Sequence, residues 1–445
     1  MERRRRQFAP VRALRAVHTL ITKECSAQEL WSAGSSAAAL ACLYCGYEVI
    51  RSTSNARFNS TCGAAQLPYL ATVATPCATA SLAGISKVVD HRGVRAACNA
   101  ACAACAAGFI VAWAVHAASP AWACPSAVLI YLLRESYVMI LSMQVWSFLN
   151  SSIRKAHAEL LFGPIQAVGI LGGTVGGLLV QQTIFSADTL LISTSLTAIA
   201  GFYGATRLGF VSAGEPSHDR PLVRFPVGTE DDGSKIYLAK GEVAKLTWRE
   251  KVGLLEKSVV LQVLFVVTVM GEVVGSNVMF GFQRALQGSG PEDEQRRFSG
   301  RFYIFVNLTA GLMQITITPL VLSRFSLRTV HIGLAVAQTG TVLGMLAYPS
   351  IQKVALAYLM RKVQTYSVLQ AAKQLSYIPL SFDARYHAKG IVDVLGARAG
   401  KAIASVVVIC LDLQGATVTL FINAFVAVLA CFAWLIATLC LPHKA

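Results

Sequence analysis

The chain has 445 residues, of which 55% are hydrophobic and only 14% are charged. Soluble domains carry roughly 25% charged residues, and a soluble core does not need repeated apolar runs of about 20 residues. This composition excludes an ordinary soluble protein and indicates an all-α polytopic membrane protein. The formal net charge of +16 does not indicate a nucleic-acid partner, because the basic residues cluster in alternate connections between apolar runs, which is the positive-inside pattern.

The apolar runs predict about twelve membrane spans, each long enough to cross the bilayer as a helix. They lie at roughly 31–50, 67–87, 97–118, 123–149, 161–181, 188–208, 258–282, 302–322, 329–348, 352–371, 390–411 and 417–441. The basic connections place both termini in the cytoplasm, and short connections favour a bacterial inner membrane. Most of the twelve cysteines lie inside apolar runs, where we expect them to fill helix contacts. Cys42-x-x-Cys45 and Cys102-x-x-Cys105 lack partner ligands, so we predict no metal site and no cofactor.

The connection over about 209–257 divides six spans from six. Its Pro- and Gly-rich start, AGEPSHDRPLVRFPVGTEDDG, is typical of a linker, and YLAKGEVAKLTWREKVGLLEK predicts a helix on the membrane surface. The predicted units are a basic cytoplasmic segment at 1–30, a six-helix bundle at 31–208, this cytoplasmic loop at 209–257 and a second six-helix bundle at 258–441.

The six-plus-six layout is similar to that of the major facilitator superfamily, whose halves surround a midplane site. The connection SKVVDHRGVR supports this resemblance, because Asp90, Gly93 and Arg95 match the loop signature Asp-x-x-Gly-x-Arg. In that superfamily the loop is a conformational latch, although an ordinary positive-inside loop would look much the same. The resemblance implies alternating access, with the two halves rocking about a central cavity.

Several charged residues fall within or beside predicted spans, where they are costly to bury and therefore indicate function. Glu48 and Arg51 are three residues apart and could pair. Arg134 and Glu135 are adjacent and do not share a helix face; Arg134 either reaches the outer interface or lines the cavity. Glu272 lies beside Gly271 and Gly275, and we expect it either to pair with an arginine of the other half or to couple protons or substrate. The glycines of FGPIQAVGILGGTVGGLL predict close helix packing.

The segment Arg361 to Lys401 resembles the ADP/ATP translocase family of plastids and intracellular bacteria, a branch related to the major facilitator superfamily. KQLSYIPL, from Lys373, is similar to Lys-Glu-Met-x-Tyr-Ile-Pro-Leu, and KGIVDVLGARAGK, from Lys389, is similar to the family's following block. Weaker matches are Arg51, Pro68, Pro76, Glu135, Trp146, Asn150, Asn277 and RFSGRFYIFVNLTAG. Four charged family positions differ, because Ser54, Asn55, Phe280 and Gln374 stand there. These changes leave the identity of the substrate open.

The sequence thus predicts a secondary transporter, not an enzyme, that moves a small, anionic or nucleotide-like organic solute. The alternatives are a non-nucleotide or proton-coupled transporter on the same fold, and a non-transporting receptor or assembly protein. We expect a monomer whose partners are the solute and the lipid bilayer. The predicted cavity residues are Arg51, Glu135, Asn150, Asn277, Arg284, Lys373, Asp393 and Arg398. The predicted gating or coupling residues are Glu48, Asp90, Arg95 and Glu272.

Overall fold

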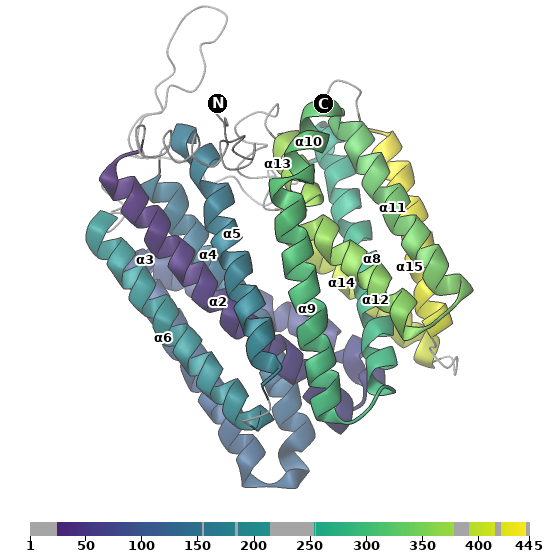
Figure 1. Cartoon of the computed structure of the whole chain (residues 1–445), viewed down its shortest axis with the longest axis horizontal. Coiled ribbons are helices and arrows are strands. Elements are labelled where there is room, and N and C mark those ends of the chain that lie inside the picture. Colours follow the sequence, from purple (N-terminus) through teal and green to yellow (C-terminus); the bar gives the residue numbers. More distant parts are fainter. Residues whose placement is uncertain are drawn as a thin grey trace, which may run out of the picture.

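The computed structural model describes residues 25–153, 155–182, 186–213, 253, 255–377, 391–413 and 420–441. Within these residues the chain is helical, and Figure 1 shows two bundles side by side. The first bundle contains α2 (Ala27–Thr61), α3 (Leu67–Ala118), α4 (Ala123–Ser152), α5 (Lys155–Val180) and α6 (Ala187–Ala213), together with the short turns η1 (Ala64–Gln66) and η2 (Pro120–Trp122).

The second bundle continues from teal-green to yellow in Figure 1. It contains α8 (Val259–Gln287), α9 (Glu292–Ile315), α10 (Ile317–Arg324), α11 (Leu327–Ala347), α12 (Ile351–Tyr366), α13 (Val368–Tyr377), η4 (Ile391–Leu395), α14 (Gly396–Leu413) and α15 (Leu420–Leu439). Among the described residues, seven helices are long and apolar enough to cross a membrane by length and composition alone. Other helices, such as α9 with its start EDEQRRFSGR, carry too many polar groups to be counted among these seven.

The predicted spans are recovered as helices, with three differences. A single helical run, α3, covers the spans predicted at 67–87 and 97–118, so the connection between them is helical rather than a loop. The spans predicted at 302–322 and 352–371 are each divided between two helices, α9 with α10 and α12 with α13. The first span was predicted to end at 50, but α2 continues to Thr61, because its polar residues from 51 to 59 are buried against protein rather than placed in water.

Two large apolar cores hold the helices together. One lies within the first bundle and includes Leu40, Phe109, Tyr137 and Phe202. The other contains aromatic residues of α8, α9 and α12 and extends to Phe58 and Tyr131 of the first bundle. Phe302 and Tyr358 stack with their rings 5.3 Å apart and almost parallel, next to Phe282. Large apolar side chains such as Leu171, Phe305 and Leu429 remain exposed, as expected of helices that face lipid.

The glycines of α5 let this helix approach two neighbours closely. A Cβ added at Gly172 would lie 2.6 Å from the Cα of Ala41 in α2, and one at Gly177 would lie 2.6 Å from the side chain of Ile304 in α9. The glycines of α5 thus allow it to pack closely on α2 at Gly172 and on α9 of the second bundle at Gly177. The predicted role in close packing is confirmed by these contacts.

Two cysteines that the sequence analysis did not single out form a disulfide. Cys62, just after α2, is bonded to Cys124 at the start of α4. The expectation that cysteines inside the predicted spans fill helix contacts is therefore wrong for Cys124, while Cys62 lies outside those spans. The reason is that the turn after α2 and the turn before α4 lie at the same end of the first bundle, which the spacing of 62 residues does not reveal.

Candidate functional site

A cavity lies between the two bundles, and both contribute to its wall. Its volume is about 130 Å³, which is smaller than the roughly 300–1,000 Å³ of a typical ligand pocket. Its lining comes from α2, α3 and α4 of the first bundle and from α8, α9, α12 and α14 of the second. A nucleotide-sized solute therefore needs a wider state of this cavity than the one seen.

Charged and aromatic side chains dominate the lining. Six cations line the cavity, namely Arg51, Arg134, Arg361, Lys362, Arg398 and Lys401, together with the carboxylates Glu135 and Glu272. Four tyrosines, Tyr47, Tyr131, Tyr303 and Tyr358, lie among them. Isolated charges are costly to bury, so the partners of these cations determine what the cavity can bind.

On the first bundle, α2 and α4 supply two buried arginines. Arg51 forms an ion pair with Glu48 one turn earlier, as its spacing predicted, and its guanidinium carbon lies 3.2 Å from the centre of the Tyr303 ring in the other bundle. Arg134 lies 3.9 Å from the centre of the Tyr131 ring. Of the two roles left open for Arg134, it takes the cavity-lining one, since it is buried.

Arg134 also connects positions that differ from the translocase motif. Its Nη1 donates to Ser54 Oγ at 3.1 Å and to Asn55 Oδ1 at 2.6 Å. Its Nη2 donates to Glu135 Oε1 at 2.9 Å. The expectation that Arg134 and Glu135 point apart is thus wrong, because the long arginine side chain reaches around the helix. Where the family motif has a Lys and an Asp, this chain has two neutral acceptors for the guanidinium of Arg134.

On the second bundle, Glu272 of α8 lies 3.5 Å from the guanidinium of Arg361 in α12. This corrects one of the two expectations for Glu272, because its partner belongs to the same bundle rather than to the other half. Gly271 and Gly275 make room for that guanidinium, since a Cβ on Gly271 would lie 2.8 Å from Arg361 Nη2. The partner was missed because helix spacing cannot tell which helices of a bundle face each other.

Further contacts join the bundles at and beside the cavity. Lys401 Nζ of α14 lies 3.5 Å from Glu135 Oε2 of α4, and Asn307 of α9 donates to Glu48 Oε1 of α2 at 3.3 Å. Arg398 of α14 also contacts the sulfur of Met139 in α4.

The remaining predicted residues lie outside the cavity lining. Asn277 is buried and donates to the carbonyl oxygen of Val273, and Arg284 lies in the last turn of α8. Lys373 forms an ion pair with Asp393 at 2.9 Å, away from the lining. Lys389, which lies four residues before Asp393 in the sequence, is outside the described residues. The side chains of Asn150, Asp90 and Gln374 are also outside the described part, and Arg95 is half-buried in α3.

Sequence reasoning did not select Tyr47, Arg361 or Lys362 as site residues. The signal for the last two was present, because an Arg-Lys pair in the middle of a predicted span is costly unless it serves a function.

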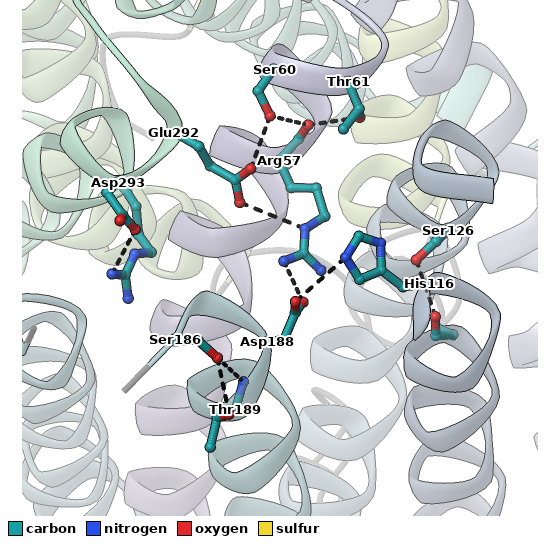
Figure 2. A network of polar contacts seen from close by, with 12 residues as sticks. Arg57, Ser60, Thr61, His116, Ser126, Ser186, Asp188, Thr189, Glu292 and Asp293 are labelled. Atoms are coloured by element: carbon teal, nitrogen blue, oxygen red, sulfur yellow. Dashed lines mark hydrogen bonds and ion pairs between the residues drawn. The ribbon is translucent and has the colours of Figure 1, made fainter. Parts of the chain in front are cut away.

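At one end of the cavity, polar contacts between the bundles form a seal, which we define by Arg57, Asn59, Ser60, Gln181, Gln283, Glu292, Gln295 and Arg301. Figure 2 shows Arg57 of α2 between Asp188 of α6 and Glu292 of α9. Ser60 donates to Glu292 at 3.0 Å, and Asn59 donates to Gln283 Oε1 at 3.0 Å. Gln181, which directly follows α5, accepts from Arg301 and donates to the carbonyl oxygen of Arg297 at 2.9 Å. By the predicted topology, this end faces outward.

Comparison with known proteins identifies the fold. Residues 306–444 match the family model described as "TLC ATP/ADP transporter", which confirms the predicted resemblance for that part of the chain. No curated protein sequence matches the chain significantly. The predicted fold class, that of the major facilitator transporters, is confirmed by solved structures with low sequence identity.

The chain is similar to the nucleoside transporter NupG, with a TM-score of 0.61 and 12% identity over 93% of this chain and 99% of that one. It is similar to a partially occluded inward-open xylose transporter XylE from E. coli, with a TM-score of 0.57 and 13% identity over 91% of this chain and 97% of that one. It is also similar to the human organic anion transporter MFSD10, with a TM-score of 0.54 and 15% identity over 91% of this chain and 99% of that one.

Proposed function

We propose that this chain, a secondary transporter of the major facilitator fold with a TLC ATP/ADP transporter match in its C-terminal part, moves a small organic anion by alternating access. The observation that supports an anionic solute is the charge of the cavity lining, where six cations face two carboxylates. A neutral solute would leave the excess positive charge in a site shielded from water, which is energetically costly. A nucleotide or similar oxyanion would neutralise it.

The arrangement of the bundles supports alternating access. The seal around Arg57 joins the bundles at one end, and the cavity lies between them. These cross-bundle contacts are polar and individually modest, so they can break and re-form as the bundles rock. In this state we place the solute's route on the side away from the seal, which is the cytoplasmic side by the predicted orientation.

The proton-coupled alternative assigns the proton to Glu135 or Glu272. Both carboxylates lie in ion pairs, Glu135 with Arg134 and Lys401, and Glu272 with Arg361. Protonating either group would remove the negative charge that balances these cations. This observation favours solute exchange or charge-driven movement over a proton carried by these two residues.

The test is uptake into proteoliposomes that contain the purified full chain, with a panel of nucleotides, nucleosides and other organic anions. The proposal predicts accumulation of at least one anion and thermal stabilisation of the protein by the same compound. If the panel's anions neither accumulate nor stabilise the protein, while an uncharged solute does, anion transport is contradicted. A receptor or assembly protein would show no solute-linked uptake of any kind.

A further inference from the structure

The six cavity cations differ in their partners. Four lie within ion-pair distance of a carboxylate: Arg51 with Glu48, Arg134 and Lys401 with Glu135, and Arg361 with Glu272. In the part of the chain that the structure describes, Lys362 and Arg398 lie in no ion pair, although both line the cavity.

We propose that Lys362 and Arg398 form an oxyanion-binding subsite that contacts the phosphate groups of the transported solute. This inference rests on the proposed function and names the residues that recognise the anion and the chemistry of the group they bind. The paired cations then shape the cavity, and Lys401 also links the two bundles through Glu135, while Lys362 and Arg398 remain available to a ligand.

The surroundings of Lys362 hold its ammonium group in place without neutralising it. Lys362 lies on α12 between Tyr358 and Tyr366, one turn away in either direction, with its Nζ 5.4 Å and 5.5 Å from the two ring centres. A tyrosine face attracts a cation through its quadrupole, but it carries no formal charge. The full positive charge of Lys362 therefore stays available to a phosphate, for which a lysine is a suitable point-charge partner.

Arg398 is held in a comparable way by a weak partner. Its guanidinium contacts the sulfur of Met139, and a thioether is only a weak hydrogen-bond acceptor. An arginine fork prefers the paired oxygens of a carboxylate or phosphate, which it binds with two parallel hydrogen bonds. A phosphate that enters the cavity offers Arg398 a much better partner than Met139.

The charge balance of the site sets the class of ligand. With Glu48, which pairs with Arg51 behind the lining, the six cations face three carboxylates, so three positive charges are in excess. A diphosphate group or pyrophosphate carries roughly that much opposite charge. A single carboxylate would leave most of the excess unbalanced, and an uncharged nucleoside would balance none of it.

The experiment uses the full chain and two measurements. Thermal unfolding in detergent is followed with sodium pyrophosphate and with adenosine, and labelled ADP uptake is followed in proteoliposomes. The variants are Lys362→Met, Lys362→Arg and Arg398→Met. The matched control is Lys353→Met, which removes an exposed lysine from the same helix, outside the cavity lining.

We expect pyrophosphate, but not adenosine, to raise the unfolding temperature of the wild type and of Lys353→Met. The shift should be lost in Lys362→Met and Arg398→Met. The ADP KM should rise by about tenfold or more in these two variants, the equivalent of roughly 1.4 kcal/mol of binding. Lys362→Arg should keep a KM within about threefold of wild type, because it retains the charge.

The two proposals fail in different ways. If the wild type takes up no anion, the proposed function is contradicted. The change in unfolding temperature caused by pyrophosphate still shows whether the subsite binds an oxyanion. A wild type that pyrophosphate does not stabilise, or an equal shift in Lys362→Met and wild type, overturns the subsite. If Lys362→Met does not insert, Lys362→Gln is compared with Lys362→Arg by the same thermal shift, and equal shifts in these two variants again overturn it.

Discussion

Glu135 of α4 and Lys401 of α14 link the two bundles across the cavity, with Lys401 Nζ 3.5 Å from Glu135 Oε2. The same carboxylate accepts from Arg134 at 2.9 Å, so it is shared between one cation of each bundle. An anionic solute that reaches this level of the cavity competes with Glu135 for Lys401. Under the proposed function, solute binding and the contact between the bundles are thereby coupled through one carboxylate.

The substitution Glu135→Gln keeps the shape of the side chain and removes its charge. It leaves the buried Arg134 without its carboxylate partner, and breaking a buried pair costs roughly 3–5 kcal/mol. The pair with Lys401, which is more exposed, adds roughly 1 kcal/mol or less. We expect a large drop in the unfolding temperature and a loss of uptake of about tenfold or more. Lys401→Gln should be milder, because Glu135 keeps its contact with Arg134. Thermal unfolding and uptake of both variants test this order, and a more severe effect of Lys401→Gln would contradict it.

Gly172 should not tolerate even one added methyl group. A Cβ there would lie 2.6 Å from the Cα of Ala41, and backbone cannot move aside as a side chain can. We expect Gly172→Ala to reduce the yield of folded protein and its unfolding temperature. Gly344→Ala in α11 is the control, because nothing lies within 4 Å of its added Cβ and alanine favours a helix by up to about 1 kcal/mol. Equal stability of the two variants would show that α5 and α2 are not packed as described.

The disulfide between Cys62 and Cys124 provides a test of orientation. Both cysteines lie at the end of the first bundle that the basic connections assign to the outside, and disulfides persist in oxidising compartments. On intact cells, we expect an impermeant maleimide to label these cysteines only after an impermeant reductant has been added outside. The Cys62→Ser/Cys124→Ser variant should lose this signal. Labelling that requires permeabilised cells would reverse the predicted topology.

The sequence was sufficient to predict the membrane spans and the class of fold, because length and apolar character directly determine which segments can cross a membrane. It also predicted the pair of Glu48 and Arg51, which share one helix face. The predicted division into two halves and the predicted site residues stay predictions. The contacts show which of those residues line one cavity, namely Arg51, Glu135, Glu272 and Arg398.

The sequence could not predict contacts that depend on which helices are neighbours. Arg361 faces Glu272 because α12 packs on α8, and Cys62 meets Cys124 because two turns lie at the same end of a bundle. Lys373, a strong candidate from its motif, pairs with Asp393 outside the cavity lining. Lys362 lies between two tyrosines on α12, and only the packing of α12 against the other helices shows that it lines the cavity.

The central claim, transport by opening and closing of the two bundles around one cavity, is tested most directly by fixing the seal. A Cβ added at Gly300 of α9 would lie 3.0 Å from the Cβ of Val180 in α5, close to the roughly 3.5–4.5 Å separation in a disulfide. We predict that Val180→Cys/Gly300→Cys proteoliposomes stop taking up solute when oxidised and recover when reduced, whereas the same treatments leave wild-type uptake unchanged. Undiminished uptake by the fully cross-linked protein would contradict alternating access.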